Sequence, residues 1–433
     1  MFLARLLVLF SLVCISCAHS SFEQKQLKHA LDFATSNRLE LEILLQHYTY
    51  DSLKLEAAKF LIRNMPHCYS YQQGGEMDSV KRVRTYYSPF GQIDQTYARR
   101  WGHYTYRNLP KIYDAHIITA EYLIDNIDRA FDNWQKRPWN RSLSFEDFCE
   151  YLLPYRIGDE PLEEWRELYE KKYGYLLDSI YKGSDVVEAA NLVSRHLQEP
   201  VFIYCEDFEL PHIGPRYLFS HRYGSCVDAA DIVTYAFRAV GIPCMEDTDA
   251  RGGHVWNVVR DTTGRDVPIW YIASEAVRGS RDTGGYKRGK VYRPMYGFQE
   301  EKAAHLGDDW KSMPLLFYHP YMKDVSYAYY PDTLRILTGI PDDEVCYLAH
   351  FHEAHWWSCA CARSASGKME IPNLESELVY LPIKYTKGNY YPSGFPFWFA
   401  GGEINTFLPD WEKTVKVRLY RKYPVYGWLR SFM

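Results

Sequence analysis

Residues 221–244 read HRYGSCVDAADIVTYAFRAVGIPC, and residues 251–257 read RGGHVWN. A turn at Gly224-Ser225 precedes Cys226, and apolar residues then recur at the spacing of one helix face. These apolar positions are Ala229, Ile232, Val233, Ala236, Phe237 and Val240. Gly241 and Pro243 follow, and the pair is typical of a helix end with the glycine in the left-handed conformation. The pattern predicts a helix that begins at Cys226 and buries one face.

A second feature is the apolar run from Val255 to Val259, which directly follows His254 and predicts a strand. A thiol at a helix N-terminus ionises more readily, because unpaired N–H groups and the helix dipole favour the thiolate. A histidine on a neighbouring strand is able to take the thiol proton and return it to a leaving group. We therefore predict Cys226 as nucleophile and His254 as base. The alternative is that Cys226 is a buried small side chain or half of a disulfide.

The segments GSCVDAA, RAVGIPC and GGHVWN resemble the transglutaminase-like cysteine superfamily, and the resemblance is specific over residues 222–273. It implies a papain-like α+β core with the cysteine at a helix N-terminus and a histidine and an aspartate on adjacent strands. It also implies amide chemistry at a thiol, which is hydrolysis of a peptide or isopeptide bond or acyl transfer to an amine. Cys226 and His254 match the first two catalytic positions of the family.

The third catalytic position of the family, an aspartate, falls on Ser274 in this sequence, and Glu275 is next to it. We expect Glu275 to orient His254 if the end of the strand over residues 268–273 is shifted by one residue. The alternative is a site that has lost its orienting carboxylate, which leaves the wrong histidine tautomer populated. Asp261 and Asp266 lie in the intervening turn and are expected to be solvated.

An oxyanion hole at this site would use the backbone N–H of Cys226 as one donor. The second donor is not identified by the sequence. Tyr223 and His221, just upstream, are candidates, and Trp256 is a candidate substrate contact. We favour water over an amine as the group that resolves the acyl-enzyme, because a hydrolase needs no second substrate pocket.

Residues 1–16 have the pattern of a secretory signal, because Arg5 precedes an apolar run from Leu6 to Val13 that is too short to cross a bilayer. The small residue Ser16 directly before Cys17 resembles a bacterial lipobox. We expect a lipoprotein acylated at Cys17 and held at the bacterial cell envelope, with no membrane contact besides the lipid. The alternative is an ordinary signal peptide cleaved at a nearby small residue.

The composition of the 433 residues limits the classes of function. The net charge of −5 argues against nucleic-acid binding as a main task. The aromatic content of 16% favours large cores and surfaces that stack on sugars or peptides. Ten cysteines are present. Cys14 and Cys17 fall in the signal region, and the spacing of the others matches neither a disulfide framework nor a zinc site. No metal or cofactor is expected.

Three parts follow the signal in an expected α+β fold. Residues 17–135 show helical periodicity around a polar stretch, 69–108, that we interpret as a long loop. Residues 136–310 contain the cysteine domain, and residues 320–433 have short β-rich runs that predict a β-sandwich. The sequence HEAH at 352–355 lacks the four-residue histidine spacing of zinc proteases and lies in a predicted strand, so a surface strand end is expected there.

The sequence thus predicts a transglutaminase-like thiol enzyme that acts on amide bonds, with a peptide, glycopeptide or glycan as its substrate. The alternative is a catalytically degenerate relative that binds peptide or carbohydrate at the cell envelope. The departure at Ser274 from the family pattern favours this alternative.

Overall fold

The structure of the protein is a computed structural model. The structure describes residues 22–87, 105–199, 201–204, 210–250, 253–270, 272, 274–280, 287–300, 302–303, 319–337, 341–352, 355–386 and 389–413. The predicted signal and Cys17 lie outside these residues, as does the end of the predicted β-rich part after residue 413. Within the described ranges, no helix has the length and apolar character needed to cross a membrane.

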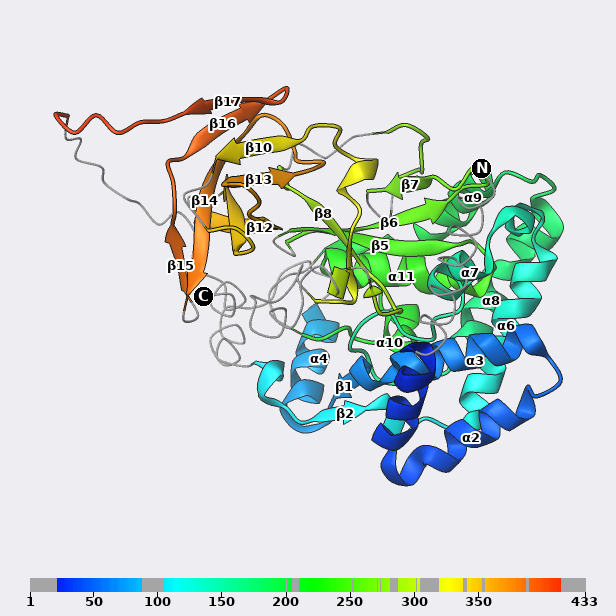
Figure 1. The fold of residues 1–433 in the computed structure, drawn as a ribbon. Helices are drawn as coiled ribbons and strands as arrows, with labels where there is room; N and C mark the ends of the chain where they lie inside the picture. Colours follow the sequence, from blue (N-terminus) through cyan, green and yellow to red (C-terminus); the bar gives the residue numbers. More distant parts are fainter. Residues whose placement is uncertain are drawn as a thin grey trace, which may run out of the picture.

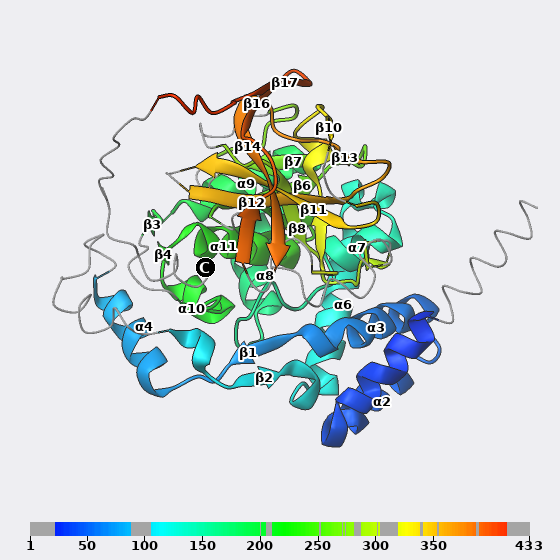
Figure 2. The same ribbon diagram turned by 60° about the vertical axis from the view of Figure 1, so that its left-hand side comes forward.

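The first part of the described chain is mainly helical and forms its own hydrophobic core. Its helices cover 22–33, α2 (Arg38–His47), α3 (Ser52–Asn64), α4 (Gly75–Tyr87), α6 (Ala120–Lys136) and α7 (Phe145–Tyr151). Asp51 caps α3, because its carboxylate accepts the Lys54 N–H at 3.1 Å. The blue N-terminal helices lie along the bottom of the molecule in both ribbon views (Figures 1 and 2).

The prediction of a long loop over residues 69–108 is wrong for its described part. Strand β1 (Tyr69–Tyr71) pairs antiparallel with β2 (Lys111–Tyr113), and α4 follows β1. Glu76 and Asp78 lie in the first turn of α4, where the positive end of the helix dipole stabilises acidic side chains. Met77 and Val80 are fully buried on one face of that helix.

A five-stranded antiparallel sheet carries the central part of the chain, in the order β7-β6-β5-β8-β9. Its strands are β5 (Cys244–Asp249), β6 (Val255–Arg260), β7 (Asp266–Ile269), β8 (Val291–Pro294) and β9 (Met322–Asp324). Helix α11 (Cys226–Ala239) packs on β5 and β6. It also contacts α8 (Arg166–Tyr175), α9 (Val186–Leu197) and α10 (Pro215–Ser220), which places it at the centre of a second core (Figure 1).

The predicted helix at Cys226 is confirmed, and so is its end. Every residue from Asp228 to Val240 is buried, so the helix is enclosed on all sides and the prediction of a single buried face is too narrow. Gly241 has φ +81°, the left-handed conformation that stops a helix. The end is also packed tightly, because a Cβ at Gly241 would lie 2.8 Å from the Asn133 carbonyl oxygen.

The last described part is a six-stranded antiparallel sheet in the order β12-β11-β14-β16-β17, with β15 paired to β14. Its strands are β11 (Val345–His352), β12 (His355–Arg363), β14 (Leu378–Thr386), β15 (Asn389–Pro392), β16 (Phe397–Ala400) and β17 (Glu403–Thr406). A separate pair, β10 (Leu334–Leu337) and β13 (Lys368–Ile371), accompanies it. Together with the helices, these sheets confirm the α+β class.

The C-terminal sheet is fastened to the central part by polar contacts at residues 287–292. Glu375 accepts the N–H groups of Arg288 and Gly289 at 2.5 and 2.9 Å. The Tyr292 hydroxyl donates to the Cys359 carbonyl at 2.9 Å. Gly289 has φ +74°, and a Cβ there would lie 2.7 Å from the His350 ring. His350 is therefore a buried side chain that packs against Gly289. The described residues contain no group of three potential metal ligands.

Candidate active site

The described structure has a small pocket at the N-terminus of α11. Cys226 and His254 both line it, so the two residues predicted to act together share one cavity. About 190 Å³ of space there is not filled by atoms. The other described lining residues are Tyr204, Ala229, Ala230, Val255, Trp256, Asn257, Ile269, Trp270 and Ile272.

The first turn of α11 fixes the position of Cys226. Ser225 is the N-cap residue, and its backbone N–H and its hydroxyl both donate to the Asp228 carboxylate, at 2.7 and 3.0 Å. The first helical hydrogen bond runs from the Ala229 N–H to the Ser225 carbonyl at 3.1 Å. Cys226 thus occupies the first helical position, where the dipole favours a negative sulfur. None of the seven cysteines that the structure describes forms a disulfide.

The backbone before β6 fixes His254. Its carbonyl accepts the Asp249 N–H at 3.2 Å and the Thr248 hydroxyl at 3.1 Å. The Asp249 carboxylate also accepts the Gly253 N–H at 2.8 Å. The imidazole stacks on the Trp256 ring, with centroids 5.7 Å apart and planes 27° apart. Trp256 is therefore both a pocket wall and a support for His254.

Asn257 ties the histidine strand to the cysteine helix. Its amide donates to the Ala230 carbonyl at 3.0 Å and to the Thr234 hydroxyl at 2.9 Å, and both acceptors belong to α11. Thr234 in turn donates to the buried Glu246 carboxylate at 2.7 Å. Asn257 is 2% exposed, so these bonds are shielded from water. Asn257 belongs to the GGHVWN motif, but the sequence gives no sign that it joins the strand to the helix.

The structure places Glu275 away from the described lining of the pocket. Its carboxylate pairs with Arg195 of α9 at 2.6 Å, and the Glu275 side chain is 52% exposed. Ile272 reaches the pocket from the same segment. The described residues that line the pocket include no aspartate or glutamate. The structure therefore does not bring the Glu275 carboxylate, which was expected to orient His254, into the pocket.

Tyr223 and His221, the candidate oxyanion donors, are also absent from the described lining. Tyr223 is 1% exposed, and its hydroxyl is hydrogen-bonded to the hydroxyl of Tyr217. The His221 ring stacks on Tyr217 with centroids 4.4 Å apart, and its Nδ1 lies 3.1 Å from the Tyr217 carbonyl oxygen. Both side chains therefore contact Tyr217 of α10.

The expectation that Asp261 and Asp266 are solvated is wrong. Asp261 is 6% exposed and accepts the N–H groups of Thr263 and Arg265 at 2.8 and 3.0 Å, which closes the turn. The Asp266 side chain is 3% exposed and pairs with Arg293 at 2.8 Å. Cationic partners from distant segments explain this burial, because a buried carboxylate is stable only when it is paired.

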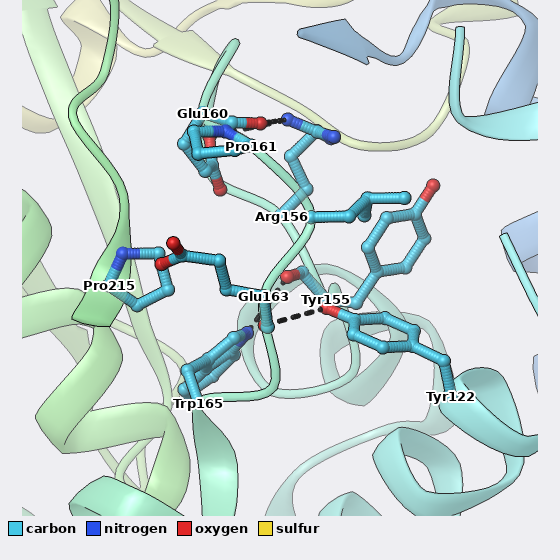
Figure 3. Close-up of a pocket in the computed structure, with 9 residues that line it drawn as sticks. Tyr122, Tyr155, Arg156, Glu160, Pro161, Glu163, Trp165 and Pro215 are labelled. Carbon is cyan, nitrogen blue, oxygen red and sulfur yellow. Dashed lines mark hydrogen bonds and ion pairs between the residues drawn. The ribbon is translucent and has the colours of Figure 1, made fainter. Parts of the chain in front are cut away.

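A second, shallow pocket lies between the helical part and the segment 155–165, and it has essentially no room for a water molecule (Figure 3). Its polar walls are bonded to one another. Arg156 pairs with the buried Asp114, the Trp165 indole donates to the Tyr155 carbonyl at 2.9 Å, and Tyr122 donates to the Glu163 carbonyl at 3.2 Å. Because these groups already satisfy one another, this pocket offers a ligand few polar partners.

Three comparisons with known proteins were negative. A scan against models of protein families, a search of curated proteins and a search of solved structures each found no match for this chain.

Proposed function

We propose that this protein is a transglutaminase-like thiol enzyme that acts on amide bonds through Cys226 and His254. The observation that carries the proposal is the shared pocket, which joins a cysteine at a helix N-terminus to a histidine at the start of the neighbouring strand. A cysteine placed in this way, with a histidine in the same cavity, is the arrangement that thiol acyl-transfer chemistry needs. The resemblance of residues 222–273 to the transglutaminase-like superfamily points to the same reaction.

The chemistry would proceed in two halves. His254 takes the Cys226 proton, the sulfur attacks the amide carbonyl carbon, and the carbonyl π electrons move to oxygen. The oxyanion then reforms the carbonyl, the C–N bond breaks, and His254 gives its proton to the departing amine. Water attacks the resulting thioester with His254 as base, which releases a carboxylic acid and returns the thiol. An amine in place of water would give acyl transfer.

The substrate class that fits best is a peptide or glycopeptide presented at the bacterial cell envelope, with the protein tethered by a lipid on Cys17. The lipobox-like residues before Cys17 and the many aromatic residues support this setting. The exposed rings of Phe351 and Trp356, with centroids 5.1 Å apart on paired strands, are suited to stack on sugar or peptide groups.

Iodoacetamide alkylation resolved by mass spectrometry tests the proposed nucleophile. We expect Cys226 to react at pH 6 at least about tenfold faster than an ordinary thiol of pKa 8.5. Cys361, which is also partly exposed, is the internal comparison in the same sample. His254→Ala should remove the low-pH reactivity of Cys226 and leave Cys361 unchanged. Equal rates for the two cysteines at pH 6 would refute the activated thiol.

A catalytically degenerate binding protein is the second candidate, and the position of Glu275 favours it. The Glu275 carboxylate is paired with Arg195, and the described lining of the pocket supplies no other acid. This candidate predicts that Cys226→Ala retains full affinity for muropeptides or oligosaccharides in calorimetry, and that Cys226 reacts with iodoacetamide as an ordinary thiol.

A further inference from the structure

Trp256 is held by a hydrogen bond to a residue that the mechanism above does not use. Its ring is 1% exposed, and its indole N–H donates to the Tyr329 hydroxyl at 3.0 Å. The Trp256 and Tyr329 rings meet edge to face, with centroids 5.8 Å apart. The residue that supports the His254 ring is thus fixed by a tyrosine that lies 73 positions further along the chain.

The Tyr329 hydroxyl is itself oriented. It donates to the Asp247 carboxylate at 2.6 Å, which leaves its oxygen to accept the Trp256 N–H. Asp247 is 0% exposed, and Arg293 donates to both of its oxygens, at 2.6 and 3.0 Å. Arg293 pairs on its other side with Asp266 at 2.8 Å. Each member of this buried network has a fixed donor or acceptor role, so the network has little freedom to rearrange.

The cation next to Trp256 restricts the indole further. The Arg288 guanidinium lies 4.9 Å from the Trp256 ring centroid and 5.0 Å from that of Trp270. Trp270 is in ring contact with Trp256 at 5.2 Å. The indole is therefore held at its N–H and packed by rings and a cation, and it presents a fixed surface to the imidazole of His254.

We propose that Tyr329 is a positioning residue for His254, acting through Trp256, with the buried Asp247 as the carboxylate that anchors the arrangement. This inference rests on the proposed function of the Cys226 and His254 pair. Glu275 is tied to Arg195 on the surface, whereas the network of Tyr329 and Asp247 reaches the support of the imidazole directly. A stacked ring limits rotation of the imidazole, so the network would hold His254 in one orientation within the pocket that it shares with Cys226.

The test is Tyr329→Phe, which removes one hydroxyl and keeps the ring. Tyr330→Phe is the matched control, because Tyr330 is a buried neighbour whose hydroxyl bonds to neither Trp256 nor Asp247. The readout is the pH profile of Cys226 alkylation by iodoacetamide, from pH 5 to 9. We expect Tyr329→Phe to slow the reaction about tenfold at pH 6, as a rise of one unit in the thiol pKa would do. At pH 9, where the thiol ionises without help, the rates should match.

The outcomes separate this inference from the proposed function. Low-pH reactivity that persists in Tyr329→Phe, or that falls equally in Tyr330→Phe, overturns the role of Tyr329 and leaves the thiol enzyme standing. Ordinary reactivity of Cys226 in the unaltered protein overturns both. If Tyr329→Phe does not fold, Trp256→Phe replaces it, because this change keeps a ring against His254 and deletes the anchored N–H. It should show the same loss at pH 6, and full low-pH reactivity in it would overturn the inference.

Discussion

Gly224→Ala should damage the start of α11, and the structure predicts by how much. Gly224 has φ +153°, and a Cβ there would lie 2.3 Å from an Asp228 carboxylate oxygen and 2.5 Å from the Asp228 Cβ. The Asp228 side chain and the turn that carries it would have to move away from Gly224, which breaks the bonds to the Ser225 N–H and hydroxyl. Losing such a cap costs about 1 kcal/mol, and a non-glycine residue in a disfavoured backbone region costs about 1–2 kcal/mol more. The total is about 2–3 kcal/mol.

Gly264→Ala is the matched control. Gly264 also has a positive φ, +76°, but a Cβ there meets no atom within 4 Å. This variant therefore carries the backbone strain alone, which is about 1 kcal/mol. The difference between the two variants reports the displaced Asp228 side chain together with any greater strain of the backbone at Gly224.

Two assays follow the change. Urea unfolding gives the free energy of unfolding of each variant, and hydrogen exchange resolves the amides of residues 226–229. We expect faster exchange in this turn for Gly224→Ala and no local change for Gly264→Ala, because the damage begins at the cap. Cys226 alkylation at pH 6 should fall with it. Equal destabilisation of the two variants, or unchanged exchange in the first turn, would refute the reasoning.

Three further predictions concern the surroundings of the pocket. Glu275→Gln should change the free energy of unfolding by less than about 0.5 kcal/mol and leave Cys226 alkylation unchanged, because Glu275 is half exposed and pairs with Arg195 on the surface. A tenfold loss of Cys226 reactivity in this variant would identify Glu275 as the acid that orients His254. Asn257→Ala should lower the free energy of unfolding in urea by about 2 kcal/mol and slow the alkylation of Cys226, because β6 loses its two hydrogen bonds to α11. Unchanged stability would contradict the role of Asn257 in joining β6 to α11. Burial raises the pKa of Glu150 from 4.5 to about 7, so the folded state holds a proton that the unfolded state releases. The free energy of unfolding should therefore fall by on the order of 3 kcal/mol as pH rises from about 4.5 to about 7, and Glu150→Gln should remove this slope in pH-dependent urea titrations.

The parts of the site that the sequence predicts are those fixed by neighbouring residues. The helix at Cys226 follows from a turn and an apolar face within twenty residues, and the stop at Gly241 needs only the freedom of glycine at positive φ. The strand after His254 is equally local, because a short apolar run has few alternatives beside a turn. The two elements do not by themselves predict that Cys226 and His254 approach each other, and that expectation depends on the resemblance of residues 222–273 to a family in which the two positions are paired.

The parts that the sequence does not predict depend on distant partners. Asp266 has the pattern of a turn residue, yet Arg293 and Tyr151 enclose it from segments that no local pattern connects to it. Tyr329 lies among other tyrosines and carries no mark of its bond to Trp256. For α4, the helix signal is the pair Met77 and Val80, spaced three apart, with acidic residues at Glu76 and Asp78 in the first turn, but the two preceding glycines favour a loop.

The buried charges under Trp256 are better explained by orientation than by stability. Desolvating Asp247 and Arg293 costs about as much as their attraction returns, and well-packed apolar groups often stabilise a core as well. What the charges supply is direction, because Arg293 fixes the Asp247 carboxylate, and the Tyr329 hydroxyl donates its hydrogen bond to one oxygen of that fixed group. That direction passes through Tyr329 to the Trp256 indole and ends at the ring on which His254 rests. A network kept for orientation should affect the pH profile of Cys226 more than the unfolding of the protein, and Tyr329→Phe measures both in one variant.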